Sequence, residues 1–169
     1  MIVLGLDPGS SVTGYGVIKL HAGDQLEHID HGVITLKKKL SLPEKLVELN
    51  AQLEQLLLKH KPSEVSIEKI FLGKNADSAF KLGHIRGVCM MQTKKQNAEV
   101  FEYAARRVKK VVTGFGAADK QQVRWMVLSL LKIKSAQKDD ATDALAMALC
   151  HARERQAIMA IKNRQIVEY

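Results

Sequence analysis

The sequence is poor in cysteine and contains no long apolar run. Its two cysteines, Cys89 and Cys150, each lie in an apolar stretch with a helical pattern, so we expect buried, reduced thiols rather than a disulfide framework. No apolar stretch approaches the roughly 20 residues that a membrane-spanning helix requires. A basic segment followed by an apolar one, which is typical of a secretory signal, is also missing at the start. These absences predict a cytoplasmic protein without a membrane-embedded segment.

Proline is scarce, with three residues in 169, and no stretch rich in Gly, Pro or Ser separates one part of the chain from another. Low-complexity segments and internal repeats are missing as well. A chain of this length is long enough to bury one core and short for two. We therefore expect a single globular domain over residues 1–156, followed by a polar tail over residues 157–169 that is either helical or disordered.

Positive charge is in excess, because 26 Lys and Arg residues stand against 18 Asp and Glu residues and give a net charge of +8. This balance favours an anionic partner, with nucleic acid as the first candidate and an anionic membrane surface as the second. A modest excess is often only a solvated face, but here the positive residues gather in short clusters. The clusters are Lys37–Lys39, Lys94–Lys95, Arg106–Arg107, Lys109–Lys110 and the group Lys132, Lys134 and Lys138.

Apolar runs and turn signals alternate along the chain in a pattern typical of an α/β protein. We expect strands at residues 2–7, 14–20, 25–36, 64–70 and 99–103, the second and third joined as a hairpin. We expect helices between the capping box at Ser41 and Pro62, over about 75–94, up to Gly114, over about 118–131, and from near Asp140. An initial meander followed by alternating helices and strands predicts a mixed β-sheet flanked by helices on both faces.

Four acidic residues interrupt stretches that otherwise look buried: Asp7, Glu68, Asp140 and Asp143. Burying an isolated carboxylate is costly unless it is paired or binds a metal. Taken singly, Asp7 fits turn chemistry before Pro8, and Asp140 and Asp143 fit the first turn of a helix. Glu68, inside a predicted core strand, has no such structural explanation. Two strands and a helix N-terminus can bring all four carboxylates together, which predicts a site for hard divalent ions that handles a polyanion, as in a nuclease.

Two other functions fit parts of the sequence. The segment from Asp7 to Gly14 is also similar to a phosphate loop of actin-like ATPases and sugar kinases, although the chain is short for such a protein and lacks a second Gly-rich nucleotide loop. The other alternative is a non-catalytic DNA-binding dimer, in which the acids only cap helices and form turns. A nuclease of the same fold that cuts RNA–DNA hybrids is a variant of the first hypothesis.

Four blocks of the sequence resemble the RuvC family, the bacterial Holliday junction resolvases of the RNase H-like superfamily. The blocks are Gly5–Gly16, Ile67–Ala79, Phe101–Arg106 and Asp140–Ala146, and the likeness covers roughly residues 2–151. The resemblance implies an RNase H-like five-stranded mixed sheet, a homodimer, and paired symmetric nicks in four-way junction DNA. It also implies a pair of Mg²⁺ ions in each site, with Mn²⁺ able to substitute, and RuvA and RuvB as branch-migration partners.

The same resemblance implies roles for individual residues. Asp7, Glu68, Asp140 and Asp143 match the metal-binding acids. Lys109 and Lys120 match basic residues near the scissile phosphate, and Lys120 is implied to be catalytic. DNA contacts are implied for Phe71, Lys74, Arg106, Lys109, Lys110 and Lys120, with Phe71 touching unstacked bases. Asp139 directly precedes Asp140, so the third acid could be either residue, and the register with Asp143 favours Asp140.

Two further features leave alternatives open. Gly83 and Gly87 lie one helical turn apart in the predicted helix over residues 75–94. They either face a partner across a dimer interface or pack against the domain's own sheet. His151 lies in the last predicted helix, where we expect a surface or packing role rather than metal ligation.

Overall fold

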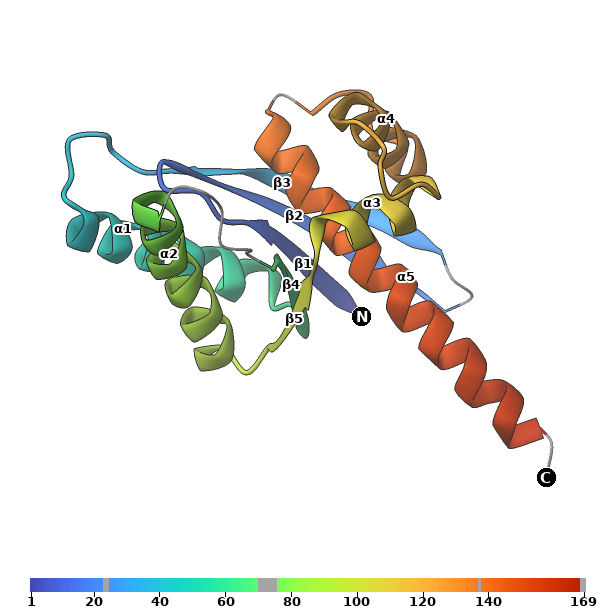
Figure 1. Cartoon of the computed structure of the whole chain (residues 1–169). Coiled ribbons are helices and arrows are strands. Elements are labelled where there is room, and N and C mark those ends of the chain that lie inside the picture. Colours follow the sequence, from blue (N-terminus) through green and yellow to red (C-terminus); the bar gives the residue numbers. More distant parts are fainter. Residues whose placement is uncertain (23–24, 70–75, 137, 168–169) are drawn as a thin grey trace.

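The computed structural model describes residues 1–22, 25–69, 76–136 and 138–167, with side chains through residue 160. Within these ranges, five strands form one sheet in the order β3-β2-β1-β4-β5 (Figure 1). The strands are β1 (Ile2–Asp7), β2 (Val12–Leu20), β3 (Leu26–Thr35), β4 (Glu64–Glu68) and β5 (Glu99–Tyr103). The β1–β2 and β2–β3 pairs are antiparallel, whereas β4 pairs in parallel with both β1 and β5. The predicted five-stranded mixed sheet is confirmed.

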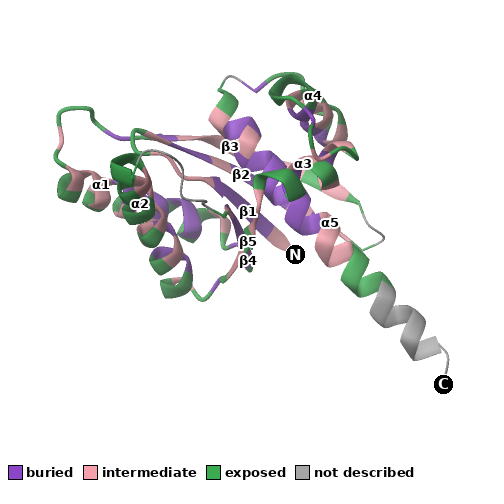
Figure 2. Cartoon of the chain, in the orientation of Figure 1, coloured by how far each residue is buried: buried purple, intermediate pink, exposed green. Residues whose placement is uncertain are grey.

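Helices cover both faces of this sheet, as predicted. They are α1 (Leu42–His60), α2 (Ala76–Lys95), α3 (Ala105–Thr113), α4 (Lys120–Leu131) and α5 (Asp139–Val167). On one face α1 and α2 close a core that includes Leu53 and Ile85. On the other face α3, α4 and α5 close a second core that includes Val127 and Leu149. Figure 2 shows that α5 is buried along its first half and becomes exposed as it leaves the domain.

Local sequence signals account for most of the element boundaries. The predicted capping box is present, since the Ser41 backbone N–H donates to Glu44 Oε2 at 2.7 Å at the start of α1. Gly114, with φ of 83°, ends α3 in the left-handed conformation that glycine tolerates best. β4 ends at Glu68, and residue 70 of the predicted strand lies outside the described residues. α5 begins one residue earlier than predicted and continues to Val167, so the expected tail is helical as far as residue 167.

The first turns of α5 lie directly on the backbone of β1 and β2. A Cβ atom at Gly14 would lie 2.0 Å from the backbone oxygen of Asp140, and one at Gly5 would lie 2.0 Å from that of Ala144. Neither glycine has a positive φ, so space rather than backbone conformation requires glycine there. This contact brings the acidic N-terminus of α5 to the end of β1.

Gly83 and Gly87 lie on the outer side of α2. Apart from the helix's own backbone, no atom of the described residues lies within 4 Å of a Cβ built at either glycine. The alternative that they pack against the domain's own sheet is therefore wrong. The exposed side chains of Phe80 and Met91, 68% and 48% accessible, belong to the same helix, whereas Ile85 is buried.

Cys89 and Cys150 are both free and buried, which confirms the prediction. Burial raises the pKa of each thiol to about 12. His151 is fully buried as well, and its ring forms hydrogen bonds with Glu64 Oε2 at 2.5 Å and with the Tyr103 hydroxyl at 2.7 Å. The packing role predicted for His151 is confirmed, and the surface alternative is wrong.

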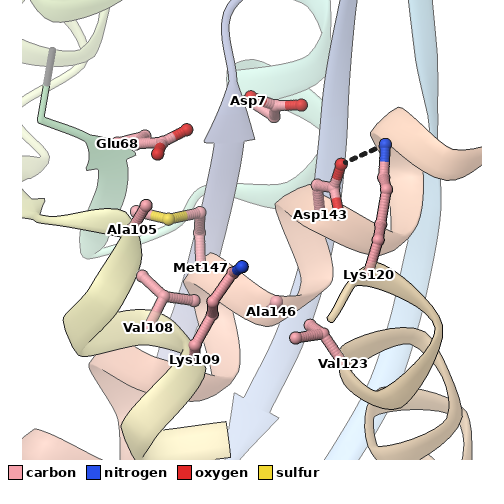
Figure 3. Close-up of a pocket in the computed structure, with 10 residues that line it drawn as sticks. All are labelled: Asp7, Glu68, Ala105, Val108, Lys109, Lys120, Val123, Asp143, Ala146 and Met147. Atoms are coloured by element: carbon pink, nitrogen blue, oxygen red, sulfur yellow. Dashed lines mark ion pairs between the residues drawn. The ribbon is translucent and has the colours of Figure 1, made fainter. Parts of the chain in front are cut away.

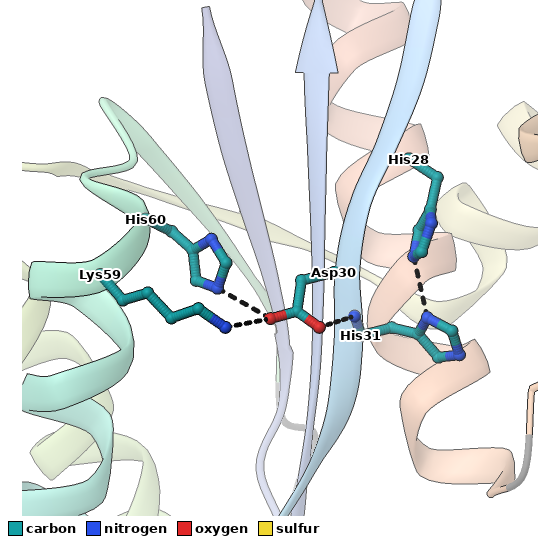
Figure 4. Close-up of polar contacts among 5 residues, drawn as sticks. All are labelled: His28, Asp30, His31, Lys59 and His60. Carbon is teal, nitrogen blue, oxygen red and sulfur yellow. Dashed lines mark hydrogen bonds and ion pairs between the residues drawn. The ribbon is translucent and has the colours of Figure 1, made fainter.

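Polar contacts anchor the edge strand β3 to α1 on one face, and two histidines of β3 contact each other (Figure 4). The Asp30 carboxylate contacts Lys59 Nζ at 2.8 Å and His60 Nε2 at 2.9 Å, and both partners belong to α1. His28 Nε2 and His31 Nδ1 form a hydrogen bond of 2.8 Å. A register shift in the β2–β3 ladder lets these two histidines share one face although they are three residues apart.

Among the described helices, none is long and apolar enough to cross a membrane.

Candidate active site

Three of the four predicted acids line one pocket, at the edge of the sheet where β1 and β4 end (Figure 3). Asp7 is the last residue of β1, Glu68 is the last residue of β4, and Asp143 lies in the second turn of α5. The carboxyl ends of adjacent parallel strands meet at the same edge of a sheet, so Asp7 and Glu68 become neighbours. The other residues that line the pocket are Ala105, Val108, Lys109, Lys120, Val123, Ala146 and Met147.

Asp140 joins this group from the first turn of α5. Its charge acts on Asp7 and on Asp143, although its side chain does not line the pocket itself. Gly14 lies against the Asp140 backbone, so the close contact that fixes α5 on the sheet also fixes the position of Asp140. The fold therefore brings together all four acids that the sequence singled out.

Asp139 has Arg124 as its nearest partner, although its charge also raises the pKa of Asp143. Its carboxylate pairs with Arg124 Nη1 at 2.7 Å and lies 4.0 Å from Lys120 Nζ, and it is exposed. Asp140, and not Asp139, is among the charges that raise the pKa of Asp7. These contacts favour Asp140 as the third acid of the group.

The carboxylates repel one another within a partly buried pocket. Burial is the main reason that the pKa of Asp7 rises from 3.8 to about 7, and the charges of Asp143, Glu68 and Asp140 add to the rise. Burial and the charge of Asp143 likewise raise the pKa of Glu68. Burial also raises the pKa of Asp143 despite the opposing effect of Lys120. A site that holds this much unneutralised negative charge favours a cation.

Two lysines border the acids. Lys120 Nζ lies 3.1 Å from Asp143 Oδ2, and this contact raises the pKa of the Lys120 ammonium group. Lys109 lines the opposite part of the pocket (Figure 3) and lowers the pKa of Glu68. Both residues were predicted to lie near the scissile phosphate. Their side chains offer positive charge at the mouth of an otherwise acidic site.

The donor set fits hard divalent ions such as Mg²⁺ or Mn²⁺, since it consists of carboxylate oxygens with surplus negative charge. Within the described ranges, no three Asp, Glu, His or Cys side chains are already grouped as ligands of one ion. The repulsion that raises the pKa of Asp7, Glu68 and Asp143 opposes such a grouping when no cation neutralises it. A bound cation would remove that repulsion.

The remaining predicted DNA contacts lie around the pocket or outside the described residues. Arg106 and Lys110 are exposed on α3, the helix that contributes Lys109. Phe71 and Lys74 fall within residues 70–75, outside the described residues. The glycines that hold α5 against the sheet were not predicted, and the only sequence signal for them is the presence of glycine at positions 5, 14 and 16 within predicted strands.

The raised pKa of Asp7 predicts a gain in stability when its charge is removed. Because the pKa in the folded protein is about 7 and the ordinary value is 3.8, the folded state favours the protonated carboxyl group. The resulting stabilisation is complete below about pH 4 and is lost as the pH rises through about 7. At pH 8 without divalent ions, Asp7→Asn should raise the free energy of unfolding by roughly 1–3 kcal/mol.

Urea denaturation in the presence of a chelator, at pH 8 and at pH 5, measures this effect. The gain should be smaller at pH 5, where wild-type Asp7 is already protonated. Asp139→Asn is the matched control, since its exposed carboxylate has an arginine partner, and it should show no gain. An Asp7→Asn protein that is less stable than the wild type at pH 8 would contradict the prediction.

Comparison with known proteins identifies the family of this chain. The family model of crossover junction endodeoxyribonuclease RuvC matches residues 3–151. RuvC of Bdellovibrio bacteriovorus is 49% identical over 161 residues, which cover 94% of this chain and 95% of that protein. The Thermus thermophilus RuvC structure has a TM-score of 0.84 and 27% identity, and the match covers 93% of this chain and 96% of that one.

A second Thermus thermophilus RuvC structure, in complex with a Holliday junction substrate, has the same TM-score of 0.84 at 24% identity, with the same coverage, and shares the fold. The family match runs through β1, β4 and the first turns of α5. It therefore includes every element that carries one of the four acids. On this near-complete match, the chain belongs to the RuvC family of crossover junction endodeoxyribonucleases.

Proposed function

We propose that this protein is a metal-dependent endonuclease that resolves Holliday junctions in homologous recombination and DNA repair. It cuts two strands of like polarity by paired, symmetric nicks. The observation that carries this proposal is the convergence of Asp7, Glu68, Asp140 and Asp143 at one edge of the sheet, beside Lys120. Membership of the RuvC family supports the choice of junction DNA as the substrate.

The four acids are the residues that would hold divalent ions, most simply two Mg²⁺ ions with Mn²⁺ able to replace them. Bound in such a site, these ions supply Lewis-acid activation of water and stabilise the leaving oxygen. The protein chain holds the four acids in fixed positions. Asp140 and Asp143 belong to one helix that is seated on glycine, and Asp7 and Glu68 belong to neighbouring strands.

Lys120 and Lys109 act on the phosphate. Lys120 is paired with Asp143, and we infer that it exchanges this partner for a phosphate oxygen when DNA and cations fill the site. A cation so placed stabilises the negative charge that develops on the phosphate during hydrolysis. The apolar side chains of Val108, Val123 and Met147 form part of the pocket wall, and by excluding water they strengthen these electrostatic contacts.

DNA binding extends over the positively charged surface around the pocket. Arg106 and Lys110 are exposed on α3 and are suited to contact the phosphate backbone, since such contacts supply most non-specific affinity. We propose that Phe71 and Lys74 also contact the junction, with the ring of Phe71 stacking on unpaired bases. Aromatic stacking suits an open junction centre because it tolerates any base.

A homodimer gives each of the two cut strands its own set of acids. We propose that the outer side of α2, with Gly83, Gly87, Phe80 and Met91, forms part of the dimer interface. Exposed apolar side chains beside glycines allow a second helix to approach closely. RuvA and RuvB are proposed as the branch-migration partners, and the cytoplasm as the compartment in which they meet.

Replacing Gly87 with Leu should separate the dimer without unfolding the chain. No described neighbour lies within 4 Å of the site, and leucine is about 0.8 kcal/mol more favourable than glycine inside a helix, so the fold should survive. Sedimentation should show monomers, and paired nicking should be lost. Val47→Leu, at a site in α1 that is 71% exposed, is the matched control and should remain dimeric. A stable dimer of folded Gly87→Leu protein would show that this side of α2 is not part of the interface.

A synthetic four-way junction tests the proposed function directly. The wild-type protein is incubated with Mg²⁺, Mn²⁺ or a chelator, and the cut positions are mapped on each strand. We expect metal-dependent nicks at matching positions on two strands of like polarity. An RNA–DNA hybrid and ATP serve as competing ligands. Preferential cutting of the hybrid, or ATP hydrolysis without nicking, would favour the alternatives instead.

A further inference from the structure

The peptide group between Glu68 and Lys69 is held from both sides. Its N–H, on Lys69, donates to the backbone oxygen of Tyr103 at 2.8 Å. Its carbonyl oxygen, on Glu68, accepts a hydrogen bond from Arg86 Nε at 3.0 Å. The first bond continues the β4–β5 ladder, but the second comes from a side chain of α2. At the end of β4, Arg86 therefore supplies the hydrogen bond that a neighbouring strand would otherwise supply.

Arg86 is itself fixed in this position. Its side chain is 15% exposed, and its Nη2 group forms an ion pair with the Glu102 carboxylate of β5. The guanidinium group is planar and rigid, so two contacts through different nitrogens define its orientation. One side chain of α2 thus connects β5 with the end of β4.

The position of this peptide group determines where the Glu68 side chain points. With the peptide after Glu68 clamped, the last backbone dihedral of that residue can no longer rotate freely, and the direction of its Cα–Cβ bond follows. Arg86 donates to the backbone oxygen of Glu68, and its other contact is with the Glu102 carboxylate. Arg86 consequently acts on Glu68 through the backbone.

We propose that Arg86 is a positioning residue, which holds the Glu68 carboxylate in the geometry needed to bind a divalent ion. The proposal rests on the function proposed above. It also assigns a second role to α2, whose outer side carries the candidate dimer surface and whose inner side fixes one of the four acids. The fixed geometry lowers the cost of bringing repelling carboxylates around a cation.

The test compares metal binding with metal-dependent cleavage in Arg86→Met and Arg86→Lys proteins. Calorimetric titration with Mn²⁺ should show affinity reduced by about 10-fold or more in Arg86→Met, the range typical of residues that orient metal ligands. The Mn²⁺ concentration for half-maximal junction cleavage should rise by a similar factor, while junction affinity in chelator stays unchanged. Lysine can reach one of the two acceptors and not both, so Arg86→Lys should fall between Arg86→Met and the wild type.

Lys94→Met is the matched control. Lys94 pairs with Glu99 at 2.6 Å and links the same two elements, α2 and β5, without touching Glu68. It should leave both Mn²⁺ affinity and cleavage unchanged. Native Mn²⁺ affinity in folded Arg86→Met, or an equal loss in Lys94→Met, would overturn the proposal. If Arg86→Met fails to fold, Glu102→Ala replaces it, and native Mn²⁺ affinity in both Glu102→Ala and Arg86→Lys would overturn it equally.

The wild-type protein in the same assays separates this proposal from the proposed function. A wild type that binds Mn²⁺ but cuts no junction would defeat the proposed function alone, and Arg86 would still be tested by the Mn²⁺ titration. A wild type that cuts junctions normally, beside an Arg86→Met protein with native metal dependence, would defeat the positioning role alone.

Discussion

Asp7→Asn, Glu68→Gln, Asp140→Asn and Asp143→Asn should each reduce junction cleavage by at least about a thousandfold. Metal ions supply several kcal/mol of transition-state stabilisation, and each 1.4 kcal/mol or so changes a rate about tenfold. Every one of these substitutions removes a charged oxygen that we propose binds a metal ion, and leaves a side chain of nearly the same shape. Single-turnover cleavage of a synthetic junction in saturating Mg²⁺ measures the loss.

Junction binding distinguishes a lost ligand from a lost fold. Removing a negative charge near the DNA lessens its repulsion from phosphate, so each variant should bind the junction as tightly as the wild type or more tightly. Asp139→Asn is the control, because Asp139 pairs with Arg124 and is not among the charges that act on Asp7, and it should stay active. Near-native cleavage by a variant of any of the four acids would show that this residue is not part of the active site.

Gly14→Ala should disturb both stability and cleavage through one added methyl group. The new Cβ would lie 2.0 Å from the Asp140 backbone oxygen and 2.5 Å from its carbonyl carbon, and neither backbone atom can swing aside as a side chain could. The first turn of α5 must move away from β2, and Asp140 moves with it. Overpacking of this kind costs about 3 kcal/mol, and cleavage should fall because the acids no longer converge.

The same substitution at a glycine that no other described part of its own domain covers provides the comparison, with both variants made in the Gly87→Leu background so that the proposed dimer contact does not contribute. Gly83→Ala adds a methyl group to α2 where no described neighbour lies within 4 Å, and alanine favours a helix over glycine by about 1 kcal/mol. Its free energy of unfolding should stay the same or rise. Thermal and urea denaturation of the two variants, beside the Gly87→Leu protein, measure the contrast. A Gly14→Ala protein of native stability would show that α5 can lie farther from the sheet without cost.

The order of strands and helices could be predicted because each element carries its own local signal. The apolar run at residues 2–7, the capping box at Ser41 and the glycine at position 114 depend only on nearby sequence. The boundary was less predictable at β4, since the strand ends at Glu68 whereas the apolar sequence pattern continues past it. α5 continues to Val167, where the polar composition left helix and disorder as equal alternatives.

The acids of the candidate site could be predicted because buried carboxylates are costly wherever they occur in a sequence. Their convergence also followed from topology, since adjacent parallel strands end at one edge. The partners of these acids could not be predicted in the same way. The contact of Lys120 with Asp143 and that of Arg86 with the Glu68 backbone depend on how helices cross the sheet, and no local pattern encodes such a crossing.

The two buried cysteines make the native chain a suitable background for site-specific labelling. A thiol reacts as its thiolate, and with the pKa of Cys89 and Cys150 raised to about 12, almost none is present at neutral pH. A cysteine introduced on the surface would then be the dominant reactive thiol, without prior removal of the native pair. Spin labels or fluorophores on the outer side of α2 could report the distance between two copies of the chain, and labels on α3 could report the approach of DNA.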